Sequence, residues 1–382
     1  MERSIKRFVS RDAIFVMAVL IISAGLFLFV GPKGSERITA FARIIEMEEN
    51  TELKGGWLKV GGQKVTARIL RGPHRGERIT VDNGLVGNLM LDRYVEVGDR
   101  AIFMLDIEEG EIKGAELVDY DRQTWQLIML IVFAALLILF ARYTGVKAFA
   151  SFIFTVVVLV KILLPAILEG YDALLLSVSL AALMATVTLL LVGGFRIRTL
   201  AAIVGVTVGM ILSASLTVLV GQGMHLRGIT SDFAVKLLFS GYSTVNLDRI
   251  FWGAVILSAS GALLDIAISV ATTVAEVVKA NPALGVRRLI RSGFAVGQAE
   301  LSTMVSTLLL AYIGYSLFLV LTLTAKGTSL VRILNMNVVS AVILRTLAGG
   351  IGMVMVAPIT AVIAGILYHR FYGLRVGISE GR

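Results

Sequence analysis

The chain has 382 residues, of which 57% are hydrophobic and only 16% are charged, and its formal net charge is +9. Soluble globular proteins carry about 25% charged residues, so this composition and a mean hydropathy of +0.85 predict a polytopic α-helical membrane protein. The absence of cysteine excludes thiol catalysis, thiolate metal sites and disulfides, and basic residues placed beside apolar blocks indicate membrane topology rather than nucleic-acid binding.

The first element is an apolar run over residues 13–30, preceded by the basic stretch MERSIKRFVSR. It fits either a cleaved signal peptide or an uncleaved anchor. The run is longer than a usual signal segment, and GPKGSER after it lacks a convincing cleavage site, which favours the anchor. Residues 1–32 are therefore predicted to form a cytoplasmic basic tail and a first transmembrane helix.

Residues 33–122 form a predicted β-rich domain. Charges and glycines return here, and apolar residues alternate with polar ones. Six short strands are expected, with turns at Gly55–Gly56, at Gly61–Gly62 and in RGPHRG. This pattern predicts a small antiparallel barrel of OB-like or SH3-like type, placed between the first and second transmembrane helices. His74 stands alone and is expected to be a loop residue.

Seven further apolar blocks follow, and each is long enough to cross a hydrocarbon core of about 30 Å. They cover residues 124–141, 148–168, 172–192, 199–220, 250–275, 302–324 and 339–367. With the first anchor they give about eight transmembrane helices. The predicted bundle occupies residues 123–370, and residues 371–382 form a second cytoplasmic tail.

The basic residues near the ends of these blocks predict the orientation. With a cytoplasmic N-terminus, fifteen lysines and arginines fall inside and five fall in the short outer loops. Both termini are then cytoplasmic and the β-domain is extracytoplasmic. FAVKLLF (233–239) in an outer loop predicts an interfacial or re-entrant helical segment, and VRRLIRSGF (286–294) predicts a basic amphipathic segment on the inner leaflet.

An acidic side chain lies in the middle of the block at 250–275. Asp265 is about 15 Å along a helix from the inner end of that block, where a charge is costly. Helical spacing places Ser258, Gly261, Ser269, Thr272 and Glu276 on the same face. Such a polar face predicts a hydrophilic path, a proton relay or a cation site, although Asp265 could instead be a structural hydrogen-bond anchor.

The next block carries a similar face, formed by Glu300, Thr303 and Thr307. Two hydroxyl-lined faces with carboxylates suit protons or hard cations. The alternative is that the small polar residues only allow close helix packing and that Glu276 and Glu300 lie among lipid headgroups.

The last block contains Arg345, which could snorkel, pair with an acidic group or bind an anion. The run that follows it contains four candidates for a helix break, Gly349, Gly350, Gly352 and Pro358. Interrupted helices line substrate sites in transporters, but glycine-rich helices are also ordinary packing elements. Gly205 and Gly209 form a GxxxG pair that favours close helix packing.

Two segments resemble the signature of the YibE/F-like family of bacterial membrane proteins. They are SASGALLDIAISVATTVAEV (258–277) and RSGFAVGQAELSTMVSTLLLAYIG (291–314). The family pattern is matched by Gly261, Asp265, Ser269, Glu276, Gly297, Thr303, Met304, Thr307 and Leu308. The resemblance implies a multi-pass, transporter-like protein of the bacterial cytoplasmic membrane, and it names no substrate.

Three functions follow as hypotheses. The first is a transporter or permease for an unknown small solute or ion, coupled to protons or a cation through Asp265. The second is a non-transporting envelope factor whose β-domain binds a partner or ligand. The third, an intramembrane enzyme, is disfavoured because no HExxH or Walker A motif and no GxSxG with a matching partner is present, so we expect no enzyme and no cofactor. The expected partners are the lipid bilayer, the solute, and a homo-oligomer or an envelope component; a metal site is left open.

Overall fold

A computed structural model describes residues 2–29, 38–54, 58–72, 74–88, 92–108, 111–242 and 245–379. The chain divides into a helical unit, Met1–Gly31 with Phe140–Arg382, and a β unit, Pro32–Leu139. This boundary falls within a long helix rather than at the expected position 122–123. The side chains of the basic N-terminal stretch, the Gly55–Gly56 turn and the last three residues of the predicted C-terminal tail lie outside the described residues.

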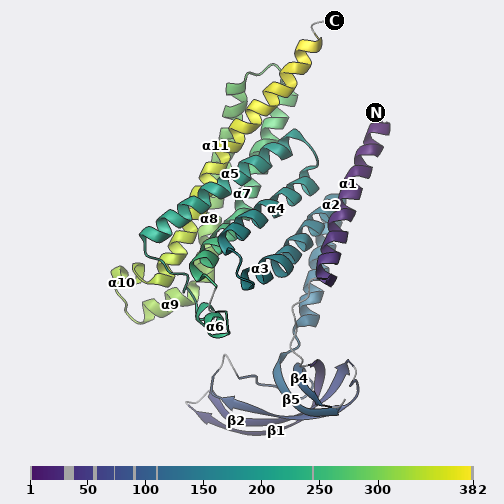
Figure 1. The fold of residues 1–382 in the computed structure, drawn as a ribbon, viewed down its shortest axis with the longest axis vertical. Helices are drawn as coiled ribbons and strands as arrows, with labels where there is room; N and C mark the ends of the chain where they lie inside the picture. Colours follow the sequence, from purple (N-terminus) through teal and green to yellow (C-terminus); the bar gives the residue numbers. More distant parts are fainter. Residues whose placement is uncertain are drawn as a thin grey trace. The chain divides into compact units, whose positions relative to one another are not determined.

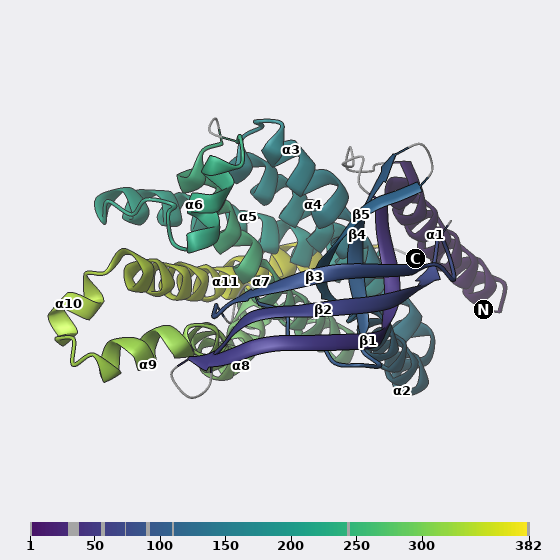
Figure 2. The same ribbon diagram turned by 90° about the horizontal axis from the view of Figure 1, so that it is seen from below.

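The β unit contains one antiparallel sheet with the strand order β3-β2-β1-β4-β5. The strands are β1 (Ile38–Lys54), β2 (Leu58–Arg71), β3 (Arg78–Val86), β4 (Arg100–Glu108) and β5 (Glu111–Tyr120). The first part of β1 pairs with β4 and its longer second part pairs with β2, with register shifts between Phe41 and Glu46. Figure 2 shows that β1 bends there, so that β4 and β5 cross β2 and β3 steeply. The sheet is nearly closed, as the predicted small barrel requires.

Alternating side chains fill this barrel. Its buried cluster includes Ile44, Val65, Ile69, Phe103 and Leu105, each at most 2% exposed. The period of two along each strand places these residues on one face, so the alternation predicted the core correctly.

A buried glutamine was not predicted. Gln63 is 1% exposed, and its amide donates to the Val95 carbonyl (3.1 Å) and accepts from the Val95 amide (3.2 Å) and from Asn83 Nδ2 (3.1 Å). The segment before β4 is thereby held to β2 and β3 by hydrogen bonds that satisfy a buried polar group.

The predicted turn at Gly61–Gly62 is wrong, which reduces six expected strands to five. Both glycines lie inside β2. Gly61 has φ +137°, and a Cβ there would lie 2.3 Å from the Asn50 carbonyl oxygen of β1. The glycine serves a close approach between two paired strands rather than a reversal of the chain.

Among the residues that the structure describes, six helices are long and apolar enough to cross a membrane. They are the stretch Gln123–Leu168, α4 (Ala173–Gly193), α5 (Ile197–Gly223), α7 (Leu247–Ala280), α8 (Val286–Tyr315) and the part Asn337–Phe371 of α11 (Asn337–Ser379). The helix α1 (Glu2–Phe29) adds a shorter apolar segment, Asp12–Leu28. The chain therefore combines a membrane-type helical region with a β domain, as predicted.

The stretch Gln123–Leu168 holds two of the predicted spans. It comprises α2 (Gln123–Val158), a π-helical turn at Leu159–Leu163 and α3 (Leu164–Leu168), 46 residues in all. An unbroken helix of this size would be about 69 Å long, more than twice the apolar thickness of a bilayer. Arg142 has a non-helical backbone, φ 50° and ψ −126°, and it divides the stretch near the expected boundary.

Two other segments differ in detail from expectation. The block expected at 302–324 is split, because α8 ends at Tyr315 and α9 (Leu317–Ala325) follows Ser316. The basic segment at 286–294 is the first part of α8 and is not a separate element. The expected helix near 233–239 is present as α6 (Asp232–Phe239), and α10 (Leu330–Leu334) precedes α11.

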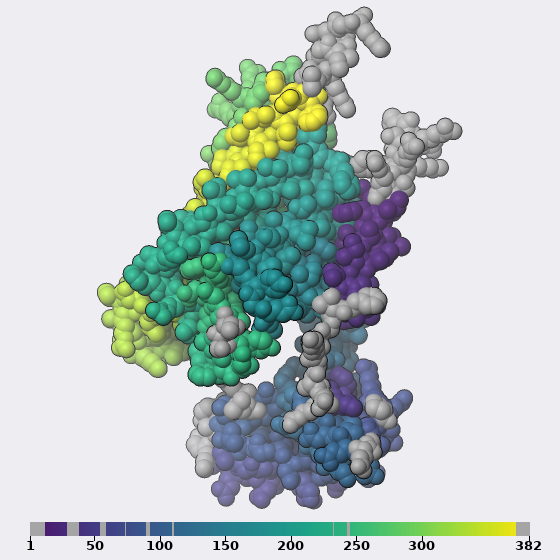
Figure 3. All heavy atoms as spheres, viewed as in Figure 1, coloured from purple at the N-terminus to yellow at the C-terminus, as the bar shows by residue number. Residues whose placement is uncertain are grey.

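Within the helical unit, α7 packs against α4, α5, α8 and α11. Glycines allow close approach: a Cβ on Gly205 or Gly209 of α5 would lie 2.0 Å from Thr360 or Val356 of α11. α1 lies on the outer surface of the unit (Figures 1 and 3), where Asp12 pairs with Lys147 at 2.6 Å. The start of α1 and the end of α11 lie toward the same end of the unit (Figure 1).

Candidate functional site

The polar face of α7 points away from the packed core. Neighbouring apolar residues on the other faces, such as Leu263, Ile266 and Ala267, are 0% exposed. Ser258, Gly261 and Asp265, in contrast, are exposed. The helix thus separates an apolar packing surface from a narrow polar face, as its sequence predicted.

Asp265 is not sealed in helix packing. A Cβ added to Gly261, one turn before it, would meet no atom within 4 Å. Among the described residues, no hydrogen bond or ion pair engages the Asp265 carboxylate. The carboxylate therefore faces space beside α7 that the described chain does not fill.

Glu300 of α8 lies next to this face. The Ser269 hydroxyl of α7 donates a hydrogen bond to the Glu300 carboxylate. Glu300 is half-buried, and it lies close enough to Asp265 for the two carboxylates to repel each other. The predicted polar faces of the two helices thus meet at Asp265, Ser269 and Glu300.

Within the described chain, the remaining acidic and hydroxyl candidates form no side-chain hydrogen bond or ion pair with the Asp265 or Glu300 carboxylate. Glu276 is exposed and forms an ion pair with Lys279 at 2.6 Å. Thr272 is half-buried on α7. The exposed Thr303 donates its hydroxyl proton to the main-chain carbonyl of Glu300 at 3.0 Å, and Thr307 donates to the carbonyl of Thr303 at 3.1 Å.

Arg345 marks the other end of the polar face. Its guanidinium lies between the rings of Phe251 (5.8 Å) and Tyr312 (6.0 Å), a cation–π arrangement. The Tyr312 hydroxyl donates to Ser258 Oγ at 2.9 Å. Within the described chain, Arg345 forms no ion pair, so pairing with an acidic group, one of the three alternatives, is not observed.

Tyr312 was missed by the sequence reasoning. It lies beside the expected face of α8, and an aromatic residue in a span is ordinarily read as a packing residue. Its hydrogen bond to Ser258 nevertheless joins Arg345 to the α7 face. The polar groups therefore follow α7 from Arg345, Tyr312 and Ser258 to Asp265, Ser269 and Glu300, over 11 residues or about 16 Å.

Of the two alternatives for the glycine-rich part of the last span, the structure shows ordinary packing and no helix break. α11 is continuous from Asn337 to Ser379, with Pro358 inside it. A Cβ on Gly349 would lie 3.3 Å from Ala259, and one on Gly352 would lie 3.0 Å from Ser213. Gly349 and Gly352 therefore allow α7 and α5 to pack closely against α11, whereas a Cβ on Gly350 would meet no atom within 4 Å. Close packing on both sides keeps the glycine-rich stretch helical.

Among the residues that the structure describes, no three His, Asp or Glu side chains are grouped so as to hold a metal ion. A family model described as "YibE/F-like protein" matches residues 129–370, more than half of the chain. No curated protein and no solved structure matches the chain.

Proposed function

Since the chain belongs to the YibE/F-like family, with a membrane-type helical region, we propose that it is a transporter or permease of the bacterial cytoplasmic membrane. The solute is a small molecule or ion, and transport is coupled to a proton or cation through Asp265. The observation that carries the proposal is the unpaired, exposed Asp265 carboxylate on the central helix α7. An intramembrane carboxylate is costly unless water or a ligand reaches it.

Asp265 and Glu300 together supply the coupling. Two carboxylates in a medium of low dielectric repel each other strongly, and a bound proton or cation removes that repulsion. Ser269 holds the Glu300 carboxylate in place by its hydrogen bond. Loading and release of the cation would then change the charge of the face along which the solute moves.

Arg345 gives the opposite end of the face a positive charge. Flanked by two rings and without a carboxylate partner in the described chain, it suits an anionic group of a solute. The proposed orientation keeps both termini cytoplasmic, as the distribution of basic residues predicts.

The test is flux into proteoliposomes, measured for a panel of cations and small anions. Asp265→Asn should fold but abolish flux. Glu276→Gln is the matched control, because it neutralises a solvated carboxylate of the same helix that lies outside the group. Wild-type flux in Asp265→Asn would remove Asp265 from the mechanism.

A second candidate function is partner binding by the β unit. A cavity of about 410 Å³ lies between the edge strands β3 and β5, lined by Glu77, Arg78, Thr80, Glu111 and Lys113 among others. Unpaired strand edges with alternating side chains suit the addition of an extended peptide. In that case removal of residues 34–120 abolishes function in cells, whereas Asp265→Asn is tolerated.

A further inference from the structure

A second polar site lies at the end of the helical unit where α1 begins and α11 ends. Here a cavity of about 370 Å³ is lined by Phe195, Arg196, Ile197, Arg198, Ala275, Lys279, Tyr368 and Phe371. Its volume is within the range of about 300–1,000 Å³ of small-molecule sites. Lys279 is 14 residues beyond Asp265 on α7, about 21 Å along the helix, so the cavity is separate from the polar face.

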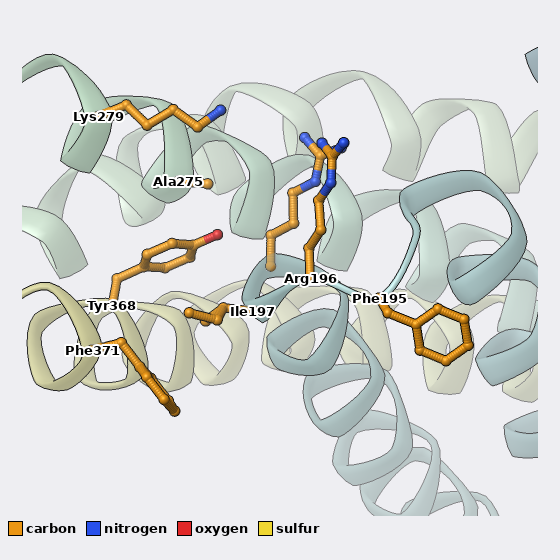
Figure 4. A pocket seen from close by; sticks show the side chains of 8 residues that line it. Phe195, Arg196, Ile197, Ala275, Lys279, Tyr368 and Phe371 are labelled. Carbon is orange, nitrogen blue, oxygen red and sulfur yellow. The ribbon is translucent and has the colours of Figure 1, made fainter. Parts of the chain in front are cut away.

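Three elements bring the lining side chains together. Arg196 is the N-cap of α5 and Arg198 lies in its first turn, directly after the tight turn in which Gly194 adopts φ +71°. Lys279 comes from the end of α7, and Tyr368 comes from α11. Figure 4 shows the Lys279 ammonium, the Arg196 guanidinium and the Tyr368 hydroxyl directed toward the same space.

The described lining includes three cationic side chains, those of Arg196, Arg198 and Lys279. Glu276 forms an ion pair with Lys279 at 2.6 Å and lies within electrostatic range of both arginines. Both arginines also lie at the start of α5, a helix of 27 residues, whose backbone amides and dipole favour anions.

Arg198 supplies the second observation. Its Nε is buried and has no hydrogen-bond partner in the described chain. A buried donor of a charged group is costly to leave unsatisfied. Arginines that only anchor a helix at the lipid surface extend into water or headgroups, whereas the Nε of this one is covered by the protein beside a partly open cavity.

We propose that this cavity, which we call the basic pocket, binds a phosphate group. Guanidinium groups match phosphate oxygens geometrically, and the Tyr368 hydroxyl is a further donor. The exposed rings of Phe195 and Phe371 would contact the remainder of the ligand. A phospholipid headgroup and a soluble phosphate compound share this chemistry.

The experiment uses the full chain in nanodiscs and follows thermal unfolding. One arm titrates inorganic phosphate into discs of zwitterionic phosphatidylcholine, and the other adds anionic phosphatidylglycerol to the discs. Stabilisation by free phosphate identifies a soluble ligand, and stabilisation by phosphatidylglycerol alone identifies a headgroup. Stabilisation in neither arm overturns the proposal.

Variants then locate the binding. Arg196→Gln with Arg198→Gln should weaken it at least about tenfold, since each charged hydrogen bond contributes appreciably. The matched control is Arg287→Gln with Arg288→Gln, an exposed pair on the same predicted side of the membrane that does not line the cavity. Equal losses in both pairs would show a general effect of surface charge and overturn the proposal.

Two milder variants serve if the double substitution fails to fold. Arg198→Lys keeps the charge but removes the planar fork, and Tyr368→Phe removes one hydroxyl. Each should weaken binding several-fold without loss of the folded protein. Unchanged binding in both would overturn the assignment of the basic pocket.

Discussion

Gly209 and Gly261 differ in what an added methyl group would meet. On α5, a Cβ at Gly209 would lie 2.0 Å from Val356 Cγ2 and 3.4 Å from Val356 Cβ. Val356 is 0% exposed, and a helical valine has one strongly preferred rotamer, so it cannot turn aside. On α7, a Cβ at Gly261 would meet nothing within 4 Å.

The two alanine variants should therefore shift stability in opposite directions. Overpacking costs about 1–3 kcal/mol, and the gain in helix propensity from Gly to Ala is about 1 kcal/mol. Gly209→Ala should lose up to about 2 kcal/mol of stability, whereas Gly261→Ala should show only the gain of about 1 kcal/mol. With about 2–4 °C per kcal/mol for a domain of this size, the Tm values should separate by several degrees.

Thermal unfolding of both variants in one detergent, followed by circular dichroism, measures the difference. A fall in Tm for Gly261→Ala as large as that for Gly209→Ala would refute the reasoning. It would mean that the face beside Asp265 is packed against protein and is not open.

Three further predictions concern single side chains. Gln63→Leu leaves the buried Val95 amide and carbonyl without partners, which costs about 1–3 kcal/mol of stability for each group. Hydrogen exchange in residues 92–96 of the full chain should therefore accelerate. Unchanged exchange would contradict the role of Gln63. His225, the residue after the C-cap of α5, has φ 52°, a conformation that glycine adopts at lower cost. His225→Gly should therefore raise the stability by about 1 kcal/mol. A lower Tm would argue against the left-handed conformation of His225. Burial raises the pKa of Asp119, but hydrogen bonds from Arg122 and the Tyr120 amide and the charges of Arg93 and Arg122 hold that pKa below its ordinary value of 3.8. A carboxyl whose pKa is lower in the folded state stabilises the protein above its ordinary pKa, and this stability is lost as the pH falls through the folded-state pKa. The decrease in Tm between about pH 5 and pH 3 should therefore be smaller in Asp119→Asn than in the wild type. An equal decrease would contradict the role of Asp119.

The helical architecture was largely predictable, because long apolar runs have one stable arrangement in a bilayer. Strand boundaries were less so. Gly61–Gly62 has the composition of a turn, yet the close approach of β1 keeps both glycines in a strand. That contact joins Gly61 to Asn50 of the neighbouring strand, so the residues around Gly61 could not predict it.

The candidate site was predictable along each helix but not between helices. Helical spacing identified the face of Asp265 and Ser269, and the structure adds its contact with Glu300. For Arg345 the sequence left snorkelling, an acidic partner and anion binding open, and it did not indicate the two aromatic rings that flank the guanidinium. Its partner rings come from α7 and α8, and only the packing of three helices brings them together.

The basic pocket illustrates a second limit. Arg196, Arg198 and Lys279 served the sequence reasoning only as indicators of topology. Their convergence depends on the tight α4–α5 turn and on how α7 and α11 end beside it. Charge near a membrane surface is common, and the buried Arg198 Nε beside a cavity distinguishes this cluster from a plain anchor.

The most direct test asks whether water reaches the face of Asp265. The chain has no cysteine, so a single introduced thiol reports on its own position, and water-soluble reagents react with thiolates. Gly261→Cys on the polar face should be labelled in membranes by a charged thiol reagent. Ala259→Cys, buried on the same helix, and Leu310→Cys, exposed on an apolar part of α8, should not. Labelling of Gly261→Cys alone is the predicted result, and a Gly261→Cys thiol as unreactive as that of Leu310→Cys would contradict a water-accessible path.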